Sequence, residues 1–126
     1  MKPFTTEQLA QFNRSGYLIV PDLATRSECA RMIALARDHL ARAVAPVEYE
    51  ADVGYPGAPA SKAAPGGRTI RRLLQACARD PVFAAWATDP RVVARVQQLF
   101  ARPVVLPQAH HNCVMTKQPG FSSETH

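Results

Sequence analysis

The sequence predicts an α+β fold in which helices come first and strands follow. Three observations support this prediction. Apolar residues recur at helical spacing over much of residues 5–100, helix-starting motifs precede these segments, and the spacing changes to alternation after Pro103. With 126 residues, the chain has room for one domain, or part of one, with a core of modest size.

The first predicted helix starts at a capping box. Thr5 is followed three residues later by Gln8, and the two side chains together satisfy backbone donors at a helix start. Gly16 supplies the left-handed residue that ends a helix. The apolar run at 17–20, closed by Pro21, then predicts a short buried strand.

A second capping box, Thr25 with Glu28, predicts a longer helix that ends before Pro46, because the residue before a proline avoids helical geometry. Residues 46–67 are rich in proline and glycine, which predicts an irregular loop. A loop of this length is either a functional lid or disordered, and both interpretations stay open.

The segment 69–79 is predicted to be helical from the spacing of its apolar residues. Two Asp-Pro steps follow, Asp80-Pro81 and Asp89-Pro90. Each places an acceptor at the N-cap and a proline at the first helical position, so a further helix is expected after each step.

Extended structure is predicted after Pro103, at 104–106 and again at 108–117, with a turn at Pro119 and Gly120. Polar side chains occur on both faces of the second segment, whereas a half-buried strand keeps one face apolar.

One face of this predicted strand would carry His111 and Lys117 together with Cys113 and Met115. A histidine and a lysine beside apolar residues suit the lining of a pocket for a small anion. An edge strand with one wet face is the alternative.

The histidines do not by themselves predict a metal site. His110 and His111 point to opposite faces of a strand, and a pair of His111 with His126 would need a carboxylate such as Glu124. Cys113 beside His111 has no identifiable oxyanion hole or orienting acid. No metal ligand and no catalytic residue is therefore assigned.

Cysteine usage and hydropathy predict a cytoplasmic protein. The three cysteines are widely spaced and fit neither a disulfide framework nor a metal knuckle, so they are expected to be reduced. No stretch is long and apolar enough to cross a membrane, and membrane partners are not expected.

The formal net charge of +5 comes almost entirely from arginine, mostly at helical spacing typical of solvated faces. One alternative function uses the remaining cluster: a small basic helical module that binds nucleic acid. Its residues would be Arg68, Arg71, Arg72 and Arg79. We do not favour nucleic acid as a partner, because such proteins carry a clustered basic stripe beside residues that contact bases.

The order of several short motifs resembles the phytanoyl-CoA hydroxylase (phytanoyl-CoA dioxygenase) family of iron(II)- and 2-oxoglutarate-dependent oxygenases. The motifs are Phe12-Asn13-Arg14-Ser15-Gly16-Tyr17-Leu18-Ile19-Val20-Pro21, Glu28-Cys29, Asp89-Pro90-Arg91-Val92 and Thr116-Lys117-Gln118-Pro119-Gly120. The resemblance covers nearly the whole chain. It implies N-terminal helices packed on the first strands of an incomplete double-stranded β-helix, or jelly roll.

The resemblance also implies roles for individual residues. Lys117 matches a lysine that lies near 2-oxoglutarate in some members, so it is expected to bind the cofactor. His111, Tyr49 and Tyr55 are expected to line the pocket for a small-molecule substrate. The loop at 46–67 occupies the place of a variable lid.

In this family, a His-x-Asp motif follows the lysine turn and, with a distant histidine, holds iron. The segment 122–126 resembles the residues that precede that motif. Residues 1–126 are therefore expected to be the N-terminal part of a single dioxygenase domain that is inactive alone. Fe(II) and 2-oxoglutarate are expected in the complete enzyme, and neither is expected to bind this chain alone. An anaerobic titration with both should then give no charge-transfer band. A third interpretation is an inert truncated remnant with unpaired strand edges.

Overall fold

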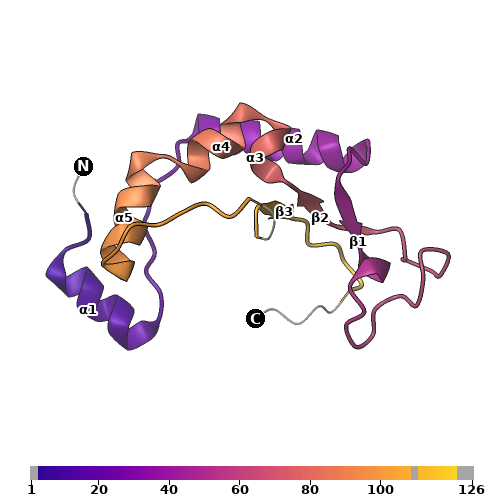
Figure 1. The fold of residues 1–126 in the computed structure, drawn as a ribbon, viewed down its shortest axis with the longest axis horizontal. Coiled ribbons are helices and arrows are strands. Elements are labelled where there is room, and N and C mark those ends of the chain that lie inside the picture. Colours follow the sequence, from indigo (N-terminus) through magenta and orange to yellow (C-terminus); the bar gives the residue numbers. More distant parts are fainter. Residues whose placement is uncertain (1–2, 109–110, 122–126) are drawn as a thin grey trace.

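The computed structural model describes residues 3–108 and 111–121 and has mixed helix and sheet, which confirms the α+β class (Figure 1). The helices are α1 (Thr6–Ser15), α2 (Arg26–Ala41), α3 (Ala76–Arg79), α4 (Pro81–Ala87) and α5 (Pro90–Phe100), with a 3₁₀ helix at Glu50–Asp52. The strands are β1 (Val47–Tyr49), β2 (Ile70–Leu74) and β3 (Cys113–Met115).

Both predicted capping boxes are present. The Thr5 side chain accepts a hydrogen bond from the Gln8 backbone N–H over 3.2 Å, and Thr25 accepts one from Glu28 over 3.1 Å. Gly16 ends α1 with a φ of 78°, which glycine adopts without strain. The starts of α1 and α2 are therefore as the sequence predicts.

The two Asp-Pro steps also start helices as predicted. Asp80 accepts a hydrogen bond from the Val82 backbone N–H over 2.9 Å, and Asp89 accepts one from Arg91 over 2.7 Å. Each side chain satisfies an orphan donor of the first turn, so α4 and α5 begin where the sequence indicates.

The strand predicted at 17–20 is wrong. These residues link α1 to α2 without strand pairing, and the side chains of Tyr17 and Ile19 are 60% and 78% exposed. The apolar run has no partner strand, and hydrophobicity alone does not form a strand without one. The longer helix, α2, ends at Ala41, before the predicted boundary at Pro46.

The helix predicted over 69–79 is also wrong. The first half of this segment is β2, and only α3 in the second half is helical, with Gln75 between them in a left-handed conformation (φ 53°). In β2, Leu73 is fully buried and adjacent residues are partly exposed, which is the alternation of a strand. Residues 70–74 form a strand because they pair with β1 and β3. The helical spacing of the apolar residues carries no information about this pairing.

β2 is the central strand of an antiparallel sheet of order β1-β2-β3. Val47 and Val114 flank Leu73, so these three side chains share one face, and β2 contacts α2. The face toward α2 therefore carries the apolar residues of the sheet.

The loop predicted at 46–67 contains β1 and the 3₁₀ helix, so it is only partly irregular. The remainder folds back on itself through backbone hydrogen bonds such as Ala58 N to Tyr55 O (2.9 Å) and Gly67 N to Ala64 O (2.9 Å). Later in the chain, Cys113–Met115 is the strand found among the described residues of 108–117, and 104–106 has no strand pairing.

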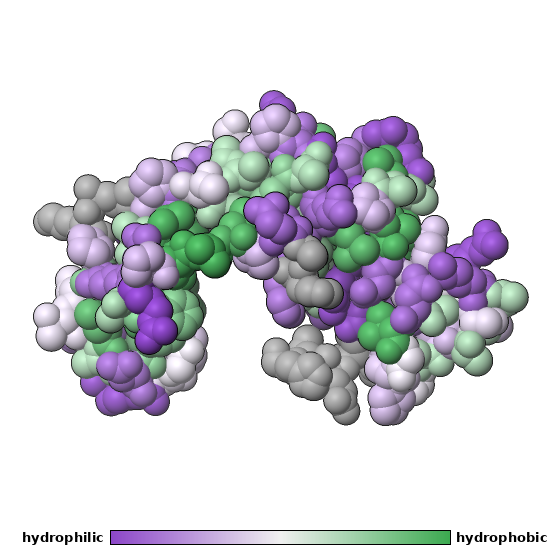
Figure 2. All heavy atoms as spheres, viewed as in Figure 1, coloured by the Kyte–Doolittle hydropathy of each residue, from purple (hydrophilic) through white to green (hydrophobic). Residues whose placement is uncertain are grey.

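The elements form an arch in which α2, α3 and α4 connect two ends (Figure 1). The sheet and the folded loop lie at one end. α1 and α5 lie at the other, where the Gln98 side chain bonds both the N–H (2.6 Å) and the carbonyl (2.8 Å) of Phe4. A strongly hydrophobic patch adjoins α5 in Figure 2, where a groove is lined by Val92, Val93, Val96 and residues 104–106.

Candidate functional site

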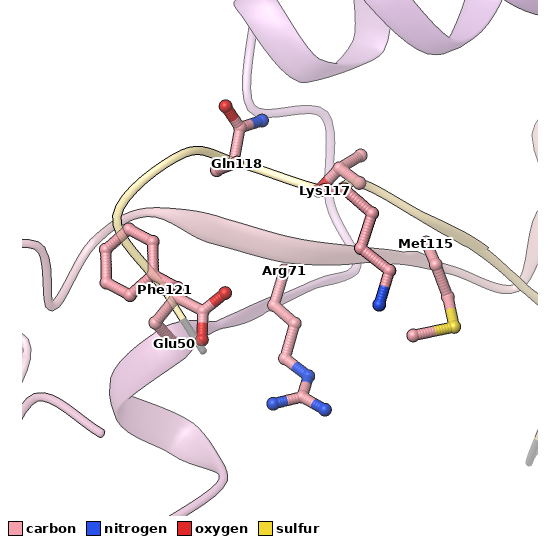
Figure 3. Close-up of a pocket in the computed structure, with 7 residues that line it drawn as sticks. Glu50, Arg71, Met115, Lys117, Gln118 and Phe121 are labelled. Carbon is pink, nitrogen blue, oxygen red and sulfur yellow. The ribbon is translucent and has the colours of Figure 1, made fainter. Parts of the chain in front are cut away.

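A small polar pocket lies on the side of the sheet away from α2, between the 3₁₀ helix, β2 and the segment that follows β3. Its lining residues are Glu50, Arg71, Met115, Thr116, Lys117, Gln118 and Phe121 (Figure 3). The enclosed space is about 20 Å³, which admits a group the size of one or two water molecules.

A β-bulge places Arg71 at this pocket. Glu48 pairs with Arg72 and Tyr49 pairs with Ile70, so Arg71 is an extra residue in β2 with no partner in β1. A bulge bends the strand and redirects a side chain.

The effect of the bulge is visible in the ion pairs of Glu48. Its Oε1 atom lies 3.6 Å from Arg71 Nε and 3.4 Å from Arg72 Nε. Consecutive residues of a regular strand point to opposite faces and do not reach one carboxylate oxygen together. The bulge therefore brings two adjacent arginines to the same side of the sheet.

Arg71 is a buried cation whose hydrogen bonds are incomplete. It is 8% exposed, and its Nε and Nη1 atoms have no hydrogen-bond partner among the described residues. Its guanidinium carbon lies 5.2 Å from the centre of the Tyr55 ring. A buried charged donor without an acceptor is costly, so an acceptor entering the pocket would be stabilised by it.

Glu50 lines the same pocket and is almost completely buried, at 3% exposed. The Tyr55 hydroxyl donates a hydrogen bond of 2.5 Å to Glu50 Oε2. This hydrogen bond to the carboxylate, together with burial, raises the pKa of Tyr55, so the hydroxyl keeps its proton at neutral pH. Tyr55 is thus the donor that accompanies the buried carboxylate.

Lys117 and Phe121 reach the pocket from the segment after β3. Hydrogen bonds from Thr116 to β2 hold this segment: its N–H donates to Arg71 O over 3.0 Å, and its hydroxyl donates to Ile70 O over 2.7 Å. Figure 3 shows the side chains of Arg71 and Lys117 pointing to the same side, away from the helix at the top of the view. The side chain of Gln118 points toward that helix.

The sequence-predicted site residues are not all brought together. Lys117 lines the pocket, and Tyr55 contacts Arg71 and Glu50. Tyr49 lies under Lys62, with Nζ 4.9 Å from the ring centre.

The expectation that His111 and Lys117 share a strand face is wrong. β3 covers only Cys113–Met115, so His111 precedes it and Lys117 follows it, and His111 has a left-handed φ of 61°. His111 lines a separate cavity with Trp86, Cys77 and Cys113, so its role in substrate binding stays a prediction.

Sequence reasoning missed Arg71 and Glu50 as pocket residues. Arg71 was placed in a basic cluster on a predicted helix, and Glu50 lay inside a predicted irregular loop. A signal was available in Ile70-Arg71-Arg72-Leu73, where two adjacent arginines stand between apolar residues, but its meaning depends on the bulge.

The basic cluster proposed for nucleic acid does not form an exposed stripe. Arg71 is buried, and Arg72 contacts Glu48. Arg79 points inward and donates to the carbonyls of Leu74 and Val44 over 2.7 and 2.8 Å. The structure therefore does not favour the nucleic-acid alternative.

Within residues 3–108 and 111–121, no three His, Cys, Asp or Glu side chains come together as a metal site. The histidines His110 and His126, and Glu124, lie outside the described residues. Cys29, Cys77 and Cys113 are free thiols. No helix in the described part has the length and apolar character required to cross a membrane.

The fold and the pocket together define an α+β protein with a cationic pocket of the kind that receives a small carboxylate or phosphate. The family follows from the sequence as a whole. The pattern of the phytanoyl-CoA dioxygenases (PhyH) matches residues 12–126, and the chain belongs to this family. Its members are small-molecule-modifying dioxygenases that use Fe(II) and 2-oxoglutarate. No curated protein and no solved structure matches the chain.

Proposed function

We propose that this chain supplies the site that binds a carboxylate of 2-oxoglutarate in an iron(II)-dependent dioxygenase that hydroxylates a small molecule. One observation carries the proposal: Arg71 is buried beside Lys117 with two guanidinium donors that lack an acceptor among the described residues. Family membership supplies the identity of the ligand.

The pocket suits one end of a dicarboxylate. Arg71 and Lys117 contribute two positive charges, and Glu50 contributes one negative charge. A carboxylate that enters would accept charge-assisted hydrogen bonds from Arg71 and would pair with Lys117. The small enclosed space fits a carboxylate group, with the rest of the ligand extending outward.

The described residues do not fit iron, because no three ligand side chains converge among residues 3–108 and 111–121. Iron and 2-oxoglutarate supply the oxidising chemistry in this family. We propose that the sheet belongs to a double-stranded β-helix, that residues 1–126 form part of a single cytoplasmic domain, and that the chain alone gives no turnover. His111 and Tyr49 are proposed substrate contacts.

The residues of this chain divide the work of binding. Arg71 and Lys117 hold the carboxylate, and the bulge in β2 keeps Arg71 on the pocket side of the sheet. Phe121 covers part of the pocket and reduces access of water. Exclusion of water strengthens an ion pair, because the local dielectric constant falls.

The buried donors of Arg71 change the expectation that the chain alone binds no 2-oxoglutarate. Isothermal titration calorimetry of the metal-free chain with 2-oxoglutarate tests the proposal. Arg71→Gln is expected to weaken binding by at least about tenfold, because it removes a buried cation that contacts the ligand. Lys117→Ala should weaken it by a smaller factor, since Lys117 is exposed. Arg68→Gln changes an exposed arginine outside the pocket and is the matched control.

Two results would contradict this function. One is the absence of 2-oxoglutarate binding at millimolar concentration. The other is equal affinity in the Arg71→Gln and Arg68→Gln chains, which would show that binding of 2-oxoglutarate depends only on the net charge of the chain.

A further inference from the structure

The folded loop of residues 53–68 reaches the pocket through Tyr55. Its ring centre lies 5.2 Å from the guanidinium carbon of Arg71, and its hydroxyl donates to Glu50 over 2.5 Å. One side chain therefore contacts both the cation and the buried anion of the pocket.

Two contacts hold the backbone near Tyr55 in place. Tyr55 O accepts a hydrogen bond from Ala58 N over 2.9 Å. Lys62 Nζ pairs with Asp52 Oδ1 over 3.1 Å, which ties the loop to the 3₁₀ helix. These contacts connect the backbone of the loop to β2, because the 3₁₀ helix is itself bonded to the residue before the strand through Glu50 N to Thr69 O (2.8 Å).

The loop contacts the pocket at a second point, on the side of Phe121. A Cβ atom added at Gly66 would lie 2.7 Å from Cζ of the Phe121 ring. Glycine at this position therefore lets the ring pack directly against the loop backbone. The loop thus contacts two pocket residues, Arg71 through Tyr55 and Phe121 through Gly66.

Arg71 depends on such support, since a guanidinium on a long side chain keeps one position only where packing restricts it. Glu48 is 3.6 Å from Nε, which is an ion pair without a hydrogen bond. The face of an aromatic ring attracts a planar cation and leaves its N–H donors free for a ligand.

We infer that Tyr55 is a positioning residue for Arg71 and thereby sets the affinity of the pocket for the ligand carboxylate. This inference rests on the proposed function, because the ligand is 2-oxoglutarate. The ring and the hydroxyl have separate roles: the ring supports Arg71, and the hydroxyl satisfies the buried carboxylate of Glu50.

The two roles are separable by substitution. Tyr55→Phe keeps the ring and removes the hydroxyl, so it should lower the unfolding midpoint but change the affinity for 2-oxoglutarate less than about threefold. Tyr55→Leu removes both, so it should lower the midpoint and weaken binding by about tenfold or more. Tyr17→Leu, at an exposed tyrosine between α1 and α2, should change neither.

A second measurement needs no ligand. The Arg71 Nε–H resonance in a nitrogen-15 NMR spectrum, assigned by its loss in Arg71→Lys, should be shifted by the aromatic ring. This shift should persist in Tyr55→Phe and disappear in Tyr55→Leu.

The inference is overturned if Tyr55→Leu leaves the Arg71 resonance unchanged, or if the Phe and Leu variants weaken binding equally. Failure of the unaltered chain to bind 2-oxoglutarate overturns the proposed function and the affinity claim with it. The NMR result still decides, separately, whether Tyr55 positions Arg71.

Discussion

The side chain of Arg91 in α5 reaches Glu28 in the first turn of α2, with Nη2 2.5 Å from Oε1. The same guanidinium bonds Asp89, the N-cap of its own helix, and lies over the Trp86 ring at 5.9 Å. Glu28 in turn belongs to the capping box with Thr25. This network joins two helix starts that are far apart in the sequence.

We predict that Arg91→Ala lowers the thermal unfolding midpoint more than Arg37→Ala, which changes an exposed arginine of α2. Arg91→Ala leaves two acidic caps without their cation and removes the contact with Trp86. Circular dichroism during heating measures the midpoint. Equal midpoints would show that the network adds nothing beyond an ordinary surface pair.

Acid should destabilise the fold through the same network. The backbone hydrogen bond of Thr25 and the Arg91 side chain lower the pKa of Glu28 below its ordinary 4.5, and Arg91 lowers the pKa of Asp89 below 3.8. A folded pKa below the unfolded value means that the unfolded chain binds more protons in acid. The stabilisation is therefore present above about pH 5 and is lost as the pH falls through the folded pKa values.

Unfolding midpoints measured from neutral to acidic pH check this expectation. Glu28→Gln should lower the midpoint at neutral pH. It should also make the decrease of the midpoint between neutral and acidic pH smaller. Glu7→Gln, at an exposed position in the first turn of α1, should keep the full acid dependence. An unchanged acid dependence in Glu28→Gln would contradict the assignment.

Arg79 connects the segment before β1 to the end of β2. It donates to the carbonyls of Leu74 (2.7 Å), Val44 (2.8 Å) and Pro46. Arg79→Ala removes these donors, so we expect a loss of about 1–3 kcal/mol in the free energy of unfolding. Urea unfolding measures it, with Arg68→Ala as the exposed control. A loss equal to the control would contradict this role.

The sequence predicted those parts of the fold that depend on neighbouring residues. Capping boxes and Asp-Pro steps act over three or four residues, so the starts of α1, α2, α4 and α5 could be placed. β1 and β2 depend on pairing across about twenty residues of loop, and such pairing overrides local spacing.

The site was predictable only in part, for a related reason. Lys117 could be identified because it lies in a short motif of the family. Arg71 takes its position from a bulge in the pairing of β1 with β2, and Glu50 from the helix that follows β1. Neither the bulge nor the 3₁₀ helix can be predicted from neighbouring residues alone. That Arg71 and Glu50 line one pocket is therefore seen only in the three-dimensional structure.

Glu48 should affect stability and ligand binding in opposite directions. It is the shared carboxylate of Arg71 and Arg72, at 3.6 and 3.4 Å from their Nε atoms. Glu48→Gln removes this negative charge, so we expect a loss of about 2–3 kcal/mol of stability and several-fold tighter binding of 2-oxoglutarate. Urea unfolding and calorimetry measure the two effects. Weaker binding in Glu48→Gln would show that Glu48 mainly orients Arg71.

Gly67 tests whether the loop must stay folded for the pocket to form. A Cβ atom at this residue would lie 2.0 Å from the Ser61 carbonyl oxygen, which is backbone and does not move without refolding the loop. Gly67→Ala should therefore cost about 3 kcal/mol of stability and also weaken binding of 2-oxoglutarate, because Tyr55 and Arg71 lose their fixed relation. Gly57→Ala is the matched control: Gly57 has a φ of 88° but nothing within 4 Å of an added Cβ. It should cost only about 1–2 kcal/mol of backbone strain and leave the affinity unchanged. If both variants kept full affinity, the loop would not support the pocket, and Arg71 would be held by the sheet alone.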